Sequence, residues 1–225
     1  MSTYLISDIH GHNETFRRAL KKVALKKTDT LIILGDIIDR GPDSKGVLDT
    51  IFLLKDHGFD VKCLKGNHEQ LFIDSFDDTY SKVSWIRNGG NLTLQSFLTS
   101  DIEGIPKKYV DFIKTFEDYI LIEDYILVHA GIDMTKKDPL EDKHSLFWLR
   151  DWQSVYDKDW LGDRTVIHGH TPMPETEIAQ QFYSEVPNVI CIDAGIYLLK
   201  EKGYGKLCIM NLERKTLNFQ NKLEK

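Results

Sequence analysis

The feature that most constrains the fold is a series of short apolar runs, each followed by a longer amphipathic stretch. The apolar runs of the first half occupy residues 3–7, 30–34 and 61–64, and the amphipathic stretches occupy residues 14–25, 43–58 and 69–76. Leucine-rich and β-branched runs that alternate with helical spacing are typical of strands and helices around a buried sheet. The pattern predicts an α/β fold.

The second half has more strand patterns than helix patterns. Residues 80–116 lack a strand pattern and are predicted to form a helical insertion that caps one edge of the sheet. Residues 119–130 are predicted to form a β-hairpin that turns at Glu123 and Asp124. Further strands are expected within residues 165–170, 188–195 and 206–219, with little helix between them. Because no linker or repeat interrupts the chain, we expect a single domain over residues 1–225.

Composition excludes several classes of protein. With 225 residues and 41% hydrophobic content the chain can bury one sizeable core, and its net charge of -6 argues against a protein that coats nucleic acid or an anionic membrane. The sequence has no apolar run long enough to span a bilayer and no secretion signal, so we expect a cytoplasmic location. Cys63, Cys191 and Cys208 each lie in an apolar run and are predicted to be buried, reduced thiols.

Residues of the types that bind metals follow five of the apolar runs. These clusters contain Asp8 and His10; Asp36, Asp39 and Arg40; Asn67 and His68; His129; and His168 and His170. Taken singly, each cluster also fits a helix cap, a turn or an interior histidine. Parallel sheets of α/β proteins place ligand sites outside the carboxyl ends of their strands, so we expect the clusters to converge.

The residue types of these clusters favour a particular kind of metal. Carboxylate oxygen, imidazole nitrogen and amide oxygen without thiolate suit Mn²⁺, Fe²⁺ or Zn²⁺ and argue against a structural zinc site. The number of candidates exceeds what one ion needs. We therefore expect two divalent ions, bridged by a carboxylate and able to activate a water for attack at phosphorus.

The motifs resemble those of the calcineurin-like metallophosphoesterases, within them the phosphoprotein phosphatase branch, and especially the small bacterial and phage enzymes related to lambda phosphatase. The resemblance extends from residue 8 to about residue 195 and rests mainly on GDIIDRG at 35–41 and GNHE at 66–69. It implies a β-sandwich flanked by helices in four layers, α/β/β/α. Manganese is the metal that we expect, with iron and zinc as alternatives.

The resemblance also implies the metal ligands and the catalytic residues. The first ion would be held by Asp8, His10 and Asp36, and the second by Asp36, Asn67, His129 and His170. By the same resemblance His68, paired with Asp39, lies beside the leaving-group oxygen. Arg40 and Arg150 would bind the phosphate. His168 has no counterpart among the family's metal ligands. We predict that it contacts and orients the ligands without binding a metal itself.

The implied activity is hydrolysis of phosphomonoesters by a water that two metal ions activate. A serine/threonine protein phosphatase is the leading interpretation, with a phosphoprotein or a phosphorylated small molecule as partner. A bis(5'-nucleosyl)-tetraphosphatase is the alternative, because small bacterial relatives share the motifs. A catalytically silent metal-binding module is a third interpretation, but metal binding alone would not require His68, Asp39, Arg40 and Arg150. The segment WIRNGG at 85–90 is interpreted mainly as a structural turn, with substrate contact as the alternative.

Overall fold

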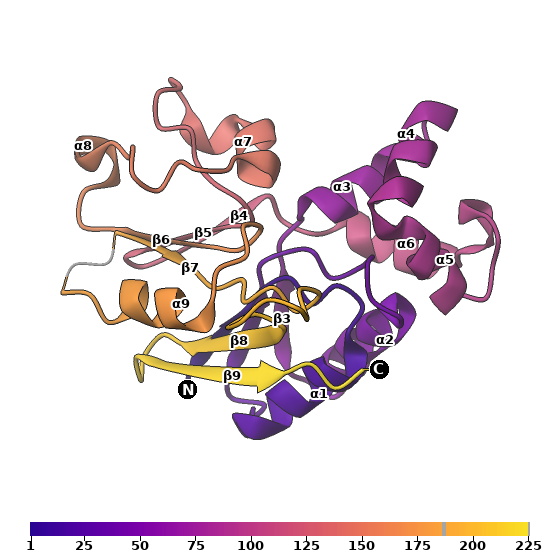
Figure 1. Ribbon diagram of the computed structural model, residues 1–225, viewed down its shortest axis with the longest axis horizontal. Helices are drawn as coiled ribbons and strands as arrows, with labels where there is room; N and C mark the ends of the chain where they lie inside the picture. The colour runs from indigo at the N-terminus through magenta and orange to yellow at the C-terminus, as the bar shows by residue number, and fades with distance from the viewer. Residues whose placement is uncertain (186–187, 225) are drawn as a thin grey trace.

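Two β-sheets form the centre of the computed structural model, which describes residues 1–185 and 188–224 (Figure 1). The first sheet has the strand order β3-β2-β1-β8-β9 and the second the order β4-β5-β6-β7. The strands are β1 (Thr3–Ile6), β2 (Thr30–Ile33), β3 (Asp60–Cys63), β4 (Tyr119–Ile122), β5 (Tyr125–Val128), β6 (Thr165–His168), β7 (Val189–Cys191), β8 (Lys206–Asn211) and β9 (Thr216–Asn221). Within the sheets β1, β2 and β3 are parallel, as are β5, β6 and β7, whereas β4, β8 and β9 pair antiparallel.

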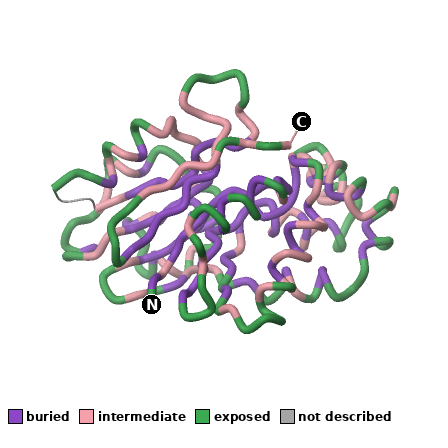
Figure 2. Tube along the Cα trace, turned by 90° about the horizontal axis from the view of Figure 1, so that it is seen from below, coloured by how far each residue is buried: buried purple, intermediate pink, exposed green. Residues whose placement is uncertain are grey.

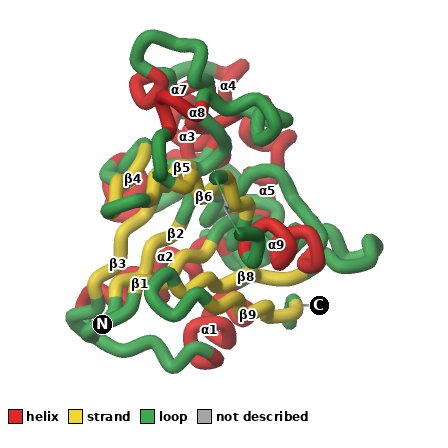
Figure 3. The backbone as a smooth tube through the Cα atoms, turned by 90° about the vertical axis from the view of Figure 1, so that its left-hand side faces the viewer, coloured by secondary structure: helices red, strands yellow, loops and turns green. Residues whose placement is uncertain are grey.

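Helices connect many of the strands, and most of them cover the outer faces of the sheets. The α-helices are α1 (Asn13–Lys22), α2 (Ser44–Asp56), α3 (Asn67–Asp74), α4 (Thr79–Trp85), α5 (Asn91–Ser96), α6 (Lys107–Lys114), α7 (Lys143–Trp148), α8 (Lys158–Leu161) and α9 (Glu175–Phe182). Shorter helical turns are η1 (Ile86–Gly90), η2 (Ile102–Gly104) and η3 (Pro139–Glu141). Figure 3 shows α1 below β8 and β9, and α7 and α8 above β5 and β6, so the two sheets lie between these helices.

Alternation along the strands produces the layers. In β1, Tyr4 and Ile6 pack toward the core that includes α1 and α2, while Leu5 packs toward the second sheet. In β5, Leu127 joins Leu5 between the sheets and Ile126 packs on the α7 side. Successive side chains of a strand point to opposite faces, so each strand contributes to two cores. The structure thus confirms the predicted α/β/β/α sandwich, whose strands are largely buried (Figure 2).

The helical insertion follows α3. Its helices α4, α5 and α6 pack mainly against α2 and α3, and Trp85 and Tyr109 join the apolar cluster that contains Ile51 of α2. At its end, Leu64 and Glu117 form a parallel bridge beside β3. The insertion therefore extends the helical layer on the side of β3 (Figure 1).

The expectation of little helix between the last strands is wrong. Helix α9 (Glu175–Phe182) lies between β6 and β7 in the chain and buries Ile178 and Phe182 in the core between the sheets. Its remaining positions are mostly polar, so the apolar spacing is too sparse to indicate a helix from sequence. Pro174 precedes the helix, and Glu175 and Glu177 lie in its first turn. Acidic side chains there interact favourably with the positive end of the helix dipole.

Among the described residues, no helix is both long enough and apolar enough to cross a membrane. The cytoplasmic location remains a prediction from the sequence.

Candidate metal centre

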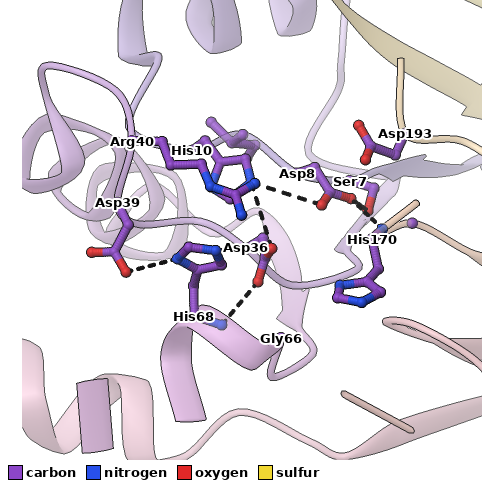
Figure 4. A network of polar contacts seen from close by, with 12 residues as sticks. Ser7, Asp8, His10, Asp36, Asp39, Arg40, Gly66, His68, His170 and Asp193 are labelled. Carbon is purple, nitrogen blue, oxygen red and sulfur yellow. Dashed lines mark hydrogen bonds and ion pairs between the residues drawn. The ribbon is translucent and has the colours of Figure 1, made fainter. Parts of the chain in front are cut away.

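Asp36 lies at the centre of the converging clusters, three residues after the end of β2 (Figure 4). Its side chain is buried, and its two carboxylate oxygens face different histidines. Oδ1 lies 3.4 Å from Nε2 of His129. Oδ2 lies 3.5 Å from Nε2 of His10 and 3.9 Å from Nε2 of His68. Two groups of possible metal-binding atoms, His10–Asp36–His68 and Asp36–His129–His170, therefore share one carboxylate.

Backbone carbonyls determine which nitrogen of two histidines carries the proton. His10 Nδ1 lies 3.1 Å from the carbonyl oxygen of Ile38, and His129 Nδ1 lies 2.8 Å from that of Leu34. A carbonyl oxygen only accepts, so each Nδ1 carries the proton and each Nε2 keeps its lone pair. Both lone pairs face Asp36. Burial lowers the pKa of His10 well below its ordinary value, which keeps this ring neutral as a ligand must be.

His170 and Asp8 lie beside each other at one side of the centre. The His170 backbone amide donates to Oδ2 of Asp8 at 3.1 Å, and Ser7 Oγ donates to the same oxygen. The other oxygen of Asp8 lies 4.0 Å from Nε2 of His10. His170 Nε2 is buried and has no hydrogen-bond partner among the described residues. Burial first, and His129 second, lower the pKa of His170 to about 2, so the ring is neutral and one of its nitrogens offers a lone pair.

These donors fit divalent cations. Asn67 Oδ1 lies 3.1 Å from His129 Nε2, and neither atom can donate to the other when Nδ1 of His129 carries the proton. An unpartnered buried imidazole nitrogen and two acceptors that face one another are stabilised when a cation binds them. The donor set of carboxylate, imidazole and amide oxygen, without thiolate, is the one that manganese, iron and zinc accept.

His68 and Asp39 form a buried pair next to this centre. His68 Nδ1 lies 2.9 Å from Oδ2 of Asp39, and the opposite nitrogen, Nε2, is buried without a hydrogen-bond partner in the described chain. Asp39 also accepts from Trp85 Nε1 at 3.0 Å and from Thr93 Oγ1 at 2.6 Å. Burial lowers the pKa of His68, but the carboxylates of Asp36 and Asp39 outweigh it and raise the pKa above its ordinary value. The two carboxylates thus favour the charged form of the imidazole, and its free nitrogen points toward Asp36.

The two arginines lie on different sides of the centre. Arg40 Nη1 donates to His10 Nε2 at 3.0 Å, and its guanidinium carbon lies 4.4 Å above the ring of Tyr197. Arg150 Nη1 donates to the carbonyl oxygen of His170 at 3.0 Å and to Thr171 Oγ1 at 3.3 Å. No ion pair of Arg150 with an acidic side chain occurs within residues 1–185 and 188–224.

His168 stands apart from both groups of metal-binding atoms. It is buried, its Nδ1 lies 2.9 Å from the carbonyl oxygen of Gly169, and its ring lies 5.4 Å from that of Trp152. Burial lowers the pKa of His168 to about 4, so the ring is neutral near pH 7. His168 thus contacts the backbone next to His170 and packs against Trp152, and it does not face Asp36 as the proposed ligands do.

Several residues that contact the site are not among the ligands and catalytic residues predicted from the sequence. Glu69, Ser7, Trp85, Thr93 and Tyr197 each contact a predicted site residue or its loop. Two of them stood inside recognised motifs, Glu69 in GNHE and Trp85 in WIRNGG. Thr93 and Tyr197 had no such signal, because their role depends on what folds against them.

Strained backbone is concentrated at the site. Of the eleven non-glycine residues with positive φ in the described chain, six are Asp8, His10, Asp36, Asp39, Arg40 and His170. L-residues rarely adopt this conformation, which costs on the order of 1–3 kcal/mol per residue and tends to cluster at functional sites. Close approach also demands glycine nearby, because a Cβ at Gly169 would lie 2.1 Å from Oδ2 of Asp8.

Comparison with known sequences gives a consistent family. The sequence profile of the calcineurin-like phosphoesterases matches residues 1–199. The chain is 37% identical over 120 residues to a symmetrical bis(5'-nucleosyl)-tetraphosphatase of Buchnera aphidicola, which covers 45% of this chain and 40% of that protein. It is 35% identical over 89 residues to serine/threonine-protein phosphatase 1 of Salmonella typhimurium, which covers 39% of this chain and 38% of that protein. The chain thus matches less than half the length of these relatives.

Solved structures share the fold. A structure provisionally assigned as a diadenosine tetraphosphatase superposes with a TM-score of 0.69 at 20% identity and covers 100% of this chain and 95% of its own. A serine/threonine phosphatase from Saccharomyces cerevisiae also gives a TM-score of 0.69, at 14% identity, and covers 100% of this chain and 81% of its own. At these identities the likeness establishes the fold.

Proposed function

Since this chain belongs to the calcineurin-like phosphoesterase family, we propose that it hydrolyses phosphate esters with two divalent metal ions held at Asp36. The observation that carries the proposal is the position of this carboxylate. Its two oxygens face two separate groups of histidine nitrogens, at 3.4 Å on one side and 3.5 Å on the other. A carboxylate shared in this way suits a pair of ions better than one ion.

The proposed ligands follow from the contacts around Asp36. We assign Asp8 and His10, with Asp36, to the first ion. Asn67, His129 and His170, again with Asp36, are assigned to the second. Manganese is the metal we expect, and iron and zinc also suit these donors. When bound, the ions would neutralise phosphoryl charge and supply a water nucleophile at neutral pH.

His68 is the proposed proton donor. Its Nδ1 is held by Asp39, which Trp85 and Thr93 orient in turn, so the free Nε2 is fixed in one direction. A charged imidazole in this position can give its proton to the departing oxygen of the ester. Arg40 and Arg150 are the proposed phosphate-binding residues, since guanidinium groups bind phosphate oxygens by paired, charge-assisted hydrogen bonds.

A phosphoserine or phosphothreonine side chain is the substrate group that this arrangement supports best. Alkoxides are poor leaving groups, and they need protonation more than phosphate leaving groups do. The buried His68–Asp39 pair provides that proton. The same pair argues against a module that binds metal without catalysis, since it contributes no contact that metal binding requires.

A dinucleoside polyphosphate is the second candidate substrate. The relative from Buchnera aphidicola and another from Nitrosomonas europaea, 30% identical over 133 residues, are both named symmetrical bis(5'-nucleosyl)-tetraphosphatases. A side-by-side activity panel of phosphopeptides and diadenosine tetraphosphate with the Mn²⁺-loaded protein tests both. Turnover of neither class, with both ions bound, would refute the proposed function.

A further inference from the structure

A cleft of about 470 Å³ opens beside Arg40, on the side of the helical insertion. Its walls are formed by Arg40, Arg87, Asn88, Gly89 and Tyr197. Two of these side chains are guanidinium groups, and the amide and the phenol can also donate hydrogen bonds. No carboxylate is among these lining residues. The cleft is therefore built to contact negative charge in a protein whose net charge is -6.

The backbone of η1 fixes the place of Arg87 relative to Arg40. Gly89 has a φ of 112° and its carbonyl oxygen accepts a hydrogen bond from the backbone amide of Arg40 at 3.4 Å. A Cβ at Gly89 would lie 2.8 Å from that amide nitrogen, so only glycine allows the two segments to approach so closely. Trp85, the residue before η1, is fully buried and donates a hydrogen bond to Asp39, which fixes the start of η1.

The guanidinium of Arg87 is available to a ligand. The side chain is exposed, and it forms no hydrogen bond or ion pair with any described residue. By contrast, Arg164 donates to the carbonyl oxygen of Leu161 at 2.9 Å and lies 4.9 Å over the ring of Trp160. Because Arg40 and Arg87 line the same cleft, an anion bound there is attracted by both guanidinium groups.

Tyr197 also lines the cleft and contacts Arg40. The guanidinium of Arg40 lies 4.4 Å above its ring, an attractive cation–π distance. Burial raises the pKa of Tyr197 to about 12, so its hydroxyl stays protonated and presents a donor, not a negative charge. Arg40, Arg87 and the Tyr197 hydroxyl thus favour an anionic ligand. The Asn88 amide donates to the carbonyl oxygen of Ser84 at 2.9 Å and keeps one N–H for a ligand.

We propose that Arg87 and Asn88 bind a second phosphoryl group of the substrate, next to the phosphoryl group that Arg40 holds. The inference rests on the proposed function and favours its second class of substrate, in which two phosphoryl groups are neighbours, whereas a phosphoserine side chain has only one. A pair of neighbouring phosphoryl groups comes from a nucleotide polyphosphate or from inorganic polyphosphate. A guanidinium suits it because its planar fork binds two phosphate oxygens together.

Binding of two non-hydrolysable probes tests the proposal without any turnover. Calorimetry would compare methylenediphosphonate, which has two phosphoryl groups, with methylphosphonate, which has one, on the protein saturated with Mn²⁺. Arg87→Ala is expected to raise the Kd of the diphosphonate about tenfold and to change the Kd of the monophosphonate less than twofold. Arg87→Lys should recover part of the loss. Arg18→Ala, which removes an exposed arginine of α1 outside the cleft, is the matched control and should change neither Kd.

The outcomes separate the binding site from the activity. An unchanged diphosphonate Kd in Arg87→Ala, or an equal loss for both probes, would overturn the proposal. Phosphopeptide binding should also be measured. If Arg87→Ala weakens only the binding of phosphopeptides with acidic residues beside the phosphoserine, Arg87 binds carboxylates and the proposal is overturned. Selective loss of diphosphonate binding supports the subsite even if no phosphate ester is hydrolysed. In supporting experiments, Kd values for ADP and for inorganic tripolyphosphate distinguish a nucleotide from an inorganic source.

Discussion

Glu69 Oε2 accepts a hydrogen bond from the backbone amide of Asp36 at 2.8 Å, so a side chain of α3 holds the loop that carries the shared carboxylate. The same carboxylate accepts from the amides of Ile37 at 2.8 Å and Gly66 at 2.9 Å. Glu69 is fully buried. It therefore joins the ends of β2 and β3 at the point where Asp36 adopts a left-handed φ of 50°.

Replacement of Glu69 by Gln should weaken metal binding although Glu69 is not a proposed ligand. The amide is the same size, but it has one acceptor oxygen where the carboxylate has two, so backbone donors of the Asp36 loop lose their partner. Mutation of a residue that hydrogen-bonds to a metal ligand or its loop typically lowers metal affinity 10–100-fold. Titration with Mn²⁺ would measure this. An unchanged affinity, with an unchanged melting temperature, would show that Glu69 does not position Asp36.

Asp36→Asn should abolish turnover and reduce the bound metal from about two ions per chain to one or fewer, because a bridging carboxylate serves both ions. Metal analysis of the purified variant gives the stoichiometry. Asp118→Asn is the control, since Asp118 pairs with Lys65 and Lys143 and is not one of the proposed ligands. Two ions and normal activity in Asp36→Asn would contradict the bridging role.

His68→Asn should lower kcat by a factor of about 10²–10⁴ while both metal ions remain bound, if His68 donates a proton and is not a ligand. The loss should be smaller for p-nitrophenyl phosphate than for phosphoserine, because p-nitrophenolate leaves without protonation. Because His68 Nε2 lies 3.9 Å from Asp36, metal content must be measured alongside. An equal loss on both substrates, or a missing ion, would argue against the general-acid role.

Arg150→Ala should weaken inhibition by inorganic phosphate about tenfold and lower kcat/KM, if the guanidinium binds phosphate. Arg150→Lys should rescue only in part because the paired hydrogen bonds are lost. The contacts of Arg150 with His170 and Thr171 allow a purely structural role, in which the alanine variant would melt at a lower temperature but bind phosphate normally. The inhibition constant and the melting temperature together decide between the two.

The ion pairs of Asp118 predict a pH-dependent stability difference. Burial raises the pKa of Asp118, but Lys143 and Lys65 outweigh it and hold that pKa below its ordinary value of 3.8. A lowered folded-state pKa means that the stabilisation is present above pH 3.8 and is lost as the pH falls through the folded-state value. Asp118→Asn should melt roughly 1–4 °C below the unmodified protein at pH 7. The difference should shrink as the pH falls below 4; a constant difference would contradict the ion-pair explanation.

Much of this protein is readable from its sequence. Alternation of apolar runs and amphipathic stretches predicts the strands and helices of the first half, because local spacing alone determines which face each element buries. The polar clusters at strand ends, together with the resemblance they carry, predict the sandwich and the residues around Asp36. Helix α9 escapes prediction because Ile178 and Phe182 provide too little apolar periodicity.

Tertiary structure alone decides how those residues are held and what lies between them. The left-handed backbone of Asp8, Asp36 and His170 is unfavourable locally and persists because contacts from distant segments outweigh its cost. The hydrogen bonds of Glu69, the orientation of Asp39 by Thr93, and the cleft between Arg40 and Arg87 also join residues far apart in the chain. Such contacts depend on packing across layers, which no local spacing encodes, whereas the order of strands, helices and ligand residues is set by local chemistry.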